Sequence, residues 1–103
     1  MPLFNPAQVT VTPSTSGTVA ATSVTASTSS VSILAANLAR KGTTIWNNST
    51  ANLYVELGAT ASTSAFTARV GASGYYEVPF TYTGAISGIW DAVNGSALVR
   101  EFA

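Results

Sequence analysis

Glutamates and tyrosines are the side chains of this sequence with the clearest capacity for chemistry. Glu56 lies two residues after Tyr54, and Glu77 lies two residues after Tyr75, in segments where apolar and polar residues alternate. Residues two apart share one face of a β-strand, so each glutamate points away from the core beside its tyrosine. If the two strands are neighbours, the carboxylates come close together, and a carboxylate pair can hydrolyse a glycosidic bond. We favour the simpler interpretation, in which an outward glutamate keeps a sheet edge from pairing with other chains.

The composition excludes most other catalytic and binding chemistry. The 103 residues include no His and no Cys, which removes the usual ligands of zinc, haem and iron–sulfur clusters and any Cys or Ser–His nucleophile. The four Lys and Arg residues balance the four Asp and Glu residues, so the chain lacks the cationic surface that nucleic acids and anionic membranes attract. We therefore expect a protein that is not an enzyme, takes no metal or cofactor, and binds neither nucleic acid nor membrane.

The aromatic residues form a second candidate site, a platform on which a sugar could stack. The residues considered for it are Tyr54, Tyr75, Tyr76, Tyr82, Trp46 and Trp90. Aromatic side chains also build small β cores and protein interfaces. Because the chain has so few charges, we predict that Trp90, together with Trp46 or its neighbour Ile45, belongs to the core. We assign Tyr54 and Tyr75 to an interface with another protein.

Arg40 and Lys41 form a small basic cluster. Two adjacent cations are too few to bind a nucleic acid. They are either the charged start of the first core strand or part of an ion pair between subunits. Exposed ion pairs contribute little to stability, which favours the first interpretation. Both residues remain candidates for a protein interface.

The elements that would position these residues are short strands. From residue 30 onward, β-rich segments recur at regular spacing between turn-forming residues, a pattern typical of a sandwich or barrel. The predicted strands cover residues 30–36, 43–47, 52–57, 65–70, 75–80, 84–90 and 96–102. The pair Asn94-Gly95 before the last strand is a strong hairpin signal. The expected fold class is therefore all-β, a small antiparallel β-sandwich or flattened barrel with an extended N-terminal arm.

Strand alternation also predicts which side chains are buried. The predicted core contains the residues Leu53, Val55, Tyr76, Val78, Ile86 and Ile89. Ile86 and Ile89 have opposite parity on one strand, so both are buried only if that strand is bulged or covered on both faces.

The first 39 residues differ sharply from the rest. None of them is charged, and 14 of the 23 residues from Thr10 to Ser32 are Ser or Thr. Such a segment is either a flexible tether or an extended arm that becomes ordered against another surface. We place the boundary after residue 29, with the arm over residues 1–29 and the β-domain over residues 30–103. The apolar anchors expected in the arm are Phe4, Val9 and Val11.

Four segments of the β-domain resemble small structural proteins of tailed bacteriophages, including cyanophages. They are RKGTTIWNNST at 40–50, NLYVELG at 52–58, GYYEVP at 74–79 and YTGAISGIW at 82–90. The resemblance covers residues 40–101 and leaves the Ser/Thr-rich arm outside it. These motifs are strand and turn sequences, and no catalytic residues come with them.

The resemblance implies a viral structural protein, most similar to a capsid decoration (cement) protein that binds the outside of a phage head and stabilises the shell. Its partner would be the major capsid protein of the virion, and proteins resembling it are commonly trimers or dimers. The N-terminus shows no secretory signal and no apolar run approaches a membrane span, so we expect synthesis in the host bacterial cytoplasm and a place on the capsid surface. Comparable modules occur in tail and fibre proteins, so the alternative function is a tail or fibre module that binds a host-surface carbohydrate or receptor.

Overall fold

The computed structural model describes residues 15–79 and 81–103, and every regular element within them is a β-strand. The strands, in chain order, are β1 (Val19–Thr25), β2 (Val31–Leu34), β3 (Gly42–Asn48), β4 (Leu53–Glu56), β5 (Ala68–Val70), β6 (Tyr75–Glu77), β7 (Ile86–Trp90) and β8 (Ser96–Phe102). The predicted all-β fold class is confirmed.

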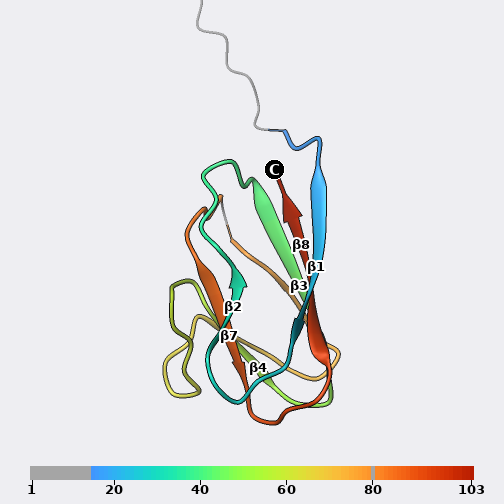
Figure 1. Ribbon diagram of the computed structural model, residues 1–103, viewed down its shortest axis with the longest axis vertical. Helices are drawn as coiled ribbons and strands as arrows, with labels where there is room; N and C mark the ends of the chain where they lie inside the picture. Colours follow the sequence, from blue (N-terminus) through green and yellow to red (C-terminus); the bar gives the residue numbers. More distant parts are fainter. Residues whose placement is uncertain (1–14, 80) are drawn as a thin grey trace, which may run out of the picture.

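The strands form two antiparallel sheets of four strands each, and the sheets pack together as a sandwich (Figure 1). Sheet A has the strand order β1-β8-β3-β6, and sheet B has the order β2-β7-β4-β5. Most hydrogen-bonded neighbours are distant in the sequence; β1, for example, pairs with the last strand, β8. The chain therefore passes repeatedly from one layer to the other, and the core lies between them.

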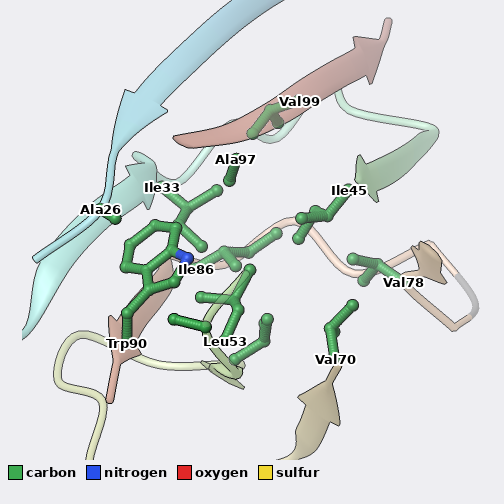
Figure 2. Close-up of a cluster of buried hydrophobic side chains, with 12 residues drawn as sticks. Ala26, Ile33, Ile45, Leu53, Val70, Val78, Ile86, Trp90, Ala97 and Val99 are labelled. Carbon is green, nitrogen blue, oxygen red and sulfur yellow. The ribbon is translucent and has the colours of Figure 1, made fainter. Parts of the chain in front are cut away.

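Alternate residues of each strand supply that core. In sheet A, Ile45 opposes Val99 and Asn47 opposes Ala97, and all four are 0% exposed. Sheet B contributes the buried residues Ile33, Leu53, Val55, Val70, Ile86 and Trp90. Figure 2 shows the apolar members of this cluster meeting between the two layers.

Most of the predicted core residues are buried. Those that lie inside the protein are Leu53, Val55, Val78 and Ile86. Tyr76 is partly buried against the same cluster. Ile89 is half-buried and lies on the outer face of β7, in register with Tyr54. The opposite parity of Ile86 and Ile89 explains the difference, because β7 presents one of them to each face.

The two tryptophans have different positions. Trp90 is 1% exposed, as predicted for a core residue, and its indole N–H donates to Oδ1 of Asn47 at 3.2 Å. Ile45 takes the inward position on β3, while Trp46 faces outward and is 43% exposed. Adjacent residues on a strand point to opposite faces, so only one of this pair enters the core.

The hairpin predicted at Asn94-Gly95 is not formed. β7 belongs to sheet B and β8 to sheet A, so residues 91–95 cross between the two layers. Gly95 does adopt the left-handed backbone that such a pair favours, with a φ of 69°, and a side chain there would collide with the carbonyl oxygen of Asn48. Only the glycine of the pair is left-handed here, whereas an Asn-Gly hairpin turn needs a positive φ at both residues, so the turn residues alone do not identify the pairing partner of the next strand.

The sandwich begins earlier in the chain than the predicted boundary at residue 30. Residues 19–25, which the sequence pattern assigned to the arm, form β1 and pair with β8 along their whole length. Six of these seven residues are exposed. Only Val24 of β1 packs against the core, so backbone hydrogen bonds to β8 are the main contacts that hold β1 in place. Amino-acid composition does not predict such bonds.

Candidate interaction surface

Arg40 lies inside the protein, so its assignment to an interface is wrong. The residue is 1% exposed, and its Nε donates to Oε2 of Glu101 at 2.8 Å. The other guanidinium nitrogens donate to the backbone carbonyl oxygens of Ala35, Tyr82 and Gly84 at 2.5, 3.2 and 2.7 Å. These bonds join β8 of sheet A to the segments beside β2 and β7 in sheet B. Arg40 therefore closes one end of the sandwich.

A buried asparagine makes a similar connection toward the other end of β3. Nδ2 of Asn47 donates to the carbonyl oxygens of Ala51, Val70 and Gly71 at 2.8, 2.9 and 3.0 Å. Its Oδ1 accepts the indole N–H of Trp90. The predicted strand 43–47 ends at Asn47, whereas β3 continues to Asn48. The side-chain amide of Asn47 has hydrogen-bond partners for both its nitrogen and its oxygen inside the core. Asn47 therefore has a structural role.

Glu56 and Glu77 do not form the carboxylate pair considered for hydrolysis. β4 lies in sheet B and β6 in sheet A, and the registers place both glutamates on outer faces, on opposite sides of the sandwich. Glu56 accepts a hydrogen bond from Oγ1 of Thr67 at 2.5 Å, and Glu77 accepts one from the hydroxyl of Tyr75 at 3.3 Å. Paired-carboxylate hydrolysis requires both groups to flank one bond, which these two do not.

Tyr54 and Tyr75, the two tyrosines predicted for an interface, lie on different faces. Tyr54 is half-buried on the outer face of sheet B, where its ring packs edge-on against Phe66 with centroids 4.9 Å apart. Tyr75 is 56% exposed on the outer face of sheet A. The two tyrosines therefore do not belong to one contact surface.

The outer face of sheet A carries a row of apolar side chains. The register places Leu98 of β8 beside Trp46 of β3, and Trp46 beside Tyr75 of β6. We call these three residues the sheet A row. The next row along the strands includes one cation, Arg100, and one anion, Glu77. The exposed face thus combines a broad apolar strip with a pair of opposite charges beside it.

A shallow groove of about 420 Å³ opens next to the sheet A row. The start of β3 and the ends of β6 and β8 line it, with Lys41, Thr44, Glu77, Pro79 and Phe102 among the lining residues. Lys41 was predicted as an interface residue and is half-buried at this groove. Its charge and that of Glu77 are opposite in sign, so the groove offers both an anionic and a cationic group to a ligand.

The phenol of Tyr75 is held in its neutral form. Desolvation raises the pKa of Tyr75 above its ordinary value of 10.0, and the negative charge of Glu77 and the hydrogen bond to its carboxylate raise it further. Burial also raises the pKa of Tyr76, which points to the inner face of β6. Tyr75 presents an aromatic ring with a polar tip, a combination that protein interfaces favour.

Two residues of the sheet A row, Trp46 and Leu98, were not identified from the sequence as interface residues. The alternation of β3 requires that either Ile45 or Trp46 face outward, but nothing in the local pattern selects which one. The predicted anchors Phe4, Val9 and Val11 lie outside the described residues.

Comparison with protein-family models, curated proteins and solved structures finds no match to this chain. In the part of the chain that the structure describes, no helix is long and apolar enough to cross a membrane. The same residues hold no group of three or more acidic side chains that could bind a metal ion.

Proposed function

We propose that this protein is a phage structural protein, a capsid decoration protein that binds the outside of the head through the outer face of sheet A. The observation that carries the proposal is the sheet A row, in which Leu98, Trp46 and Tyr75 lie side by side on an open sheet face. Tyr and Trp side chains are enriched at the centres of protein interfaces. The resemblance of the β-domain motifs to phage structural proteins supplies the class of partner, the major capsid protein.

The low charge of this face supports docking onto another protein. None of the three residues of the sheet A row is charged, so contact over the row itself buries no ion. Arg100 and Glu77 lie beside the row, where opposite charges orient a partner more than they strengthen its binding. A capsid also presents the same surface many times, so linked copies can bind firmly through individually weak contacts.

Binding to undecorated heads tests the proposal. Trp46→Ala combined with Tyr75→Ala truncates two of the three side chains of the row, and we expect the affinity for heads to fall at least about ten-fold. Phe66→Ala is the matched control, because Phe66 is also an exposed aromatic residue, at 39%, but packs on the outer face of sheet B. Co-sedimentation with heads measures the bound fraction. Equal binding by the double variant and the unmodified protein would contradict the proposal.

The second candidate function is a tail or fibre module that binds a host-surface carbohydrate. One observation favours it: the exposed rings of Trp46 and Tyr75 are neighbours in the register, and the groove whose lining includes Lys41 and Glu77 opens next to them. Surface polysaccharide from a host strain, titrated against the protein in a calorimeter, tests this function. Saturable binding that Trp46→Ala abolishes, together with full binding of that variant to heads, would favour the carbohydrate.

A further inference from the structure

The four edge strands of the sandwich are not equally protected against pairing with another strand. Natural sheets block their edges with short strands, charges, prolines and bulges. β2 has a register irregularity between Ser32 and Leu34. β5 is three residues long with Arg69 at its centre. β6 is also three residues long, ends at Glu77, and is followed closely by Pro79.

β1 has none of these protections. Its seven residues, VAATSVT, include no charge and no proline, and their register with β8 is continuous from Val19 to Thr25. Within residues 15–79 and 81–103, β8 is the only strand that pairs with β1. Figure 1 shows β1 in blue at the outer edge of sheet A. β1 is therefore an open edge.

The hydrogen bonds between β1 and β8 determine which backbone groups of β1 point to its open side. Thr18 exchanges two backbone hydrogen bonds with Ala103, and the N–H of Ala26 donates to the carbonyl oxygen of Gly95. Bonded and non-bonded pairs alternate in an antiparallel ladder, so the even-numbered residues of β1 bond to β8 and the odd-numbered residues face away. The residues whose N–H and C=O groups point to the open side are Val19, Ala21, Ser23 and Thr25.

A second copy of β1 complements this edge in a two-fold arrangement. In an antiparallel pairing centred on Thr22, Val19 meets Thr25 of the second copy, and Ala21 meets Ser23. Every open N–H and C=O group then finds a partner. Thr22 meets its own counterpart in a non-bonded pair, where side chains approach closely and Thr–Thr contacts are favourable. Because β1 carries no charge, the two copies bring no like charges together.

We propose that β1 pairs with β1 of a second copy of this chain, which joins two copies of sheet A into one continuous eight-stranded sheet. The two-fold axis of this pairing is perpendicular to the sheet, so the sheet A rows of both copies lie on the same side. A dimer of this form presents two docking faces to one partner surface, which raises its effective affinity for a repeated shell. The pairing itself does not depend on the proposed function.

Single cysteines test the register, because the chain contains no Cys of its own. Thr22→Cys places the thiol on the two-fold axis, where the Cα atoms of a non-bonded pair are about 4.5 Å apart, within the range of a disulfide. Ala20→Cys is the matched control, equally exposed, but about 13 Å along the strand from its own counterpart. We expect mild oxidation to yield a disulfide-linked dimer of Thr22→Cys at least ten-fold faster than of Ala20→Cys. A mixture of Ala20→Cys and Val24→Cys should crosslink, because these two positions oppose each other.

A charge exchange at the same position gives a readout without oxidation. Thr22→Lys and Thr22→Glu each bring like charges together across the axis, so each variant alone should be monomeric by light scattering. Their mixture should restore a one-to-one dimer, and the neutral variant Thr22→Gln should remain dimeric. Circular dichroism of each variant confirms that the fold is retained.

Equal crosslinking of Thr22→Cys and Ala20→Cys, or a monomeric unmodified protein at the concentration of the crosslinking experiment, would overturn the proposal. The open edge would then belong to another occupant, such as residues 1–14 of this chain or a strand of a shell protein. Head binding separates this failure from failure of the proposed function. If the protein is a monomer and binds heads, only the proposed β1 pairing is contradicted. If it is a dimer and does not bind heads, only the proposed docking function is contradicted.

Discussion

At the scale of single residues, Arg40 shows how one charged side chain stabilises a sandwich that has few charges. Its guanidinium satisfies the carboxylate of Glu101 and three backbone carbonyl oxygens. An arginine has five N–H donors in a planar fork, and a lysine cannot reproduce that geometry. This role cannot be predicted from the sequence, because Glu101 lies 61 positions after Arg40 and only folding brings the two side chains together.

Replacing Arg40 should therefore be costly. We expect Arg40→Ala to lower the free energy of unfolding by about 3 kcal/mol, because it leaves the Glu101 carboxylate and three partly buried carbonyl oxygens without this donor. Lys41→Ala is the control, since the Lys41 ammonium makes one long contact, 3.5 Å, to the Ala39 carbonyl oxygen. Its effect should stay within about 0.5 kcal/mol. Urea denaturation measures both, and equal effects would show that the Arg40 network does not stabilise the fold.

Tyr75 provides a test of the electrostatics on the outer face of sheet A. The carboxylate of Glu77 raises the pKa of Tyr75, so Glu77→Gln should lower that pKa toward its ordinary value, while desolvation keeps it somewhat raised. Glu56→Gln should leave the pKa of Tyr75 unchanged, because Glu56 lies on the outer face of sheet B. NMR titration of the Tyr75 ring resonances follows the ionisation. A Glu56→Gln effect as large as that of Glu77→Gln would contradict the placement of these groups.

At the scale of elements, the alternation of inward and outward residues along a strand predicts much of the core. That alternation does not predict which strands pair with each other. Leu53 and Val55 are buried because alternation turns both to one face of β4. The same rule cannot assign a strand to a sheet, which is why residues 91–95 were predicted as a hairpin and instead cross between layers. Residues 19–25 were predicted to belong to the arm for a related reason, because they form β1 through backbone hydrogen bonds to β8, at the other end of the chain.

Gly88 determines how closely β7 packs against its neighbours. A Cβ atom at this position would lie 2.6 Å from Cδ1 of Ile33 and 3.0 Å from Cδ1 of Leu53, both inside the core. We expect Gly88→Ala to destabilise the protein by about 1–3 kcal/mol, the usual cost of overpacking. Gly17→Ala is the control, because a Cβ at Gly17 meets no heavy atom within 4 Å. Thermal unfolding compares the two, and an unchanged midpoint for Gly88→Ala would mean that the core has room at this point.

At the scale of the whole molecule, the polar and aromatic side chains fall into two groups. One group holds the two sheets together, and the other is exposed. Arg40, Asn47 and Trp90 are used inside the fold, where they connect the two sheets. Trp46 and Tyr75 remain on one open face, and β1 remains on one open edge. The sequence predicted that Tyr54 and Tyr75 both face outward at an interface, but the alternation within a strand does not show which sheet the strand joins, and the two tyrosines lie on different sheets.

The most direct test of the proposed function is an electron cryo-microscopy reconstruction of the phage particle in which we propose that this protein lies. We expect density for the sandwich on the outside of the head at each repeat of the shell, with Trp46 and Tyr75 of sheet A against the capsid subunits. A sandwich present in a few copies at the tail, or bound to the head through the outer face of sheet B, would contradict the docking role assigned to sheet A.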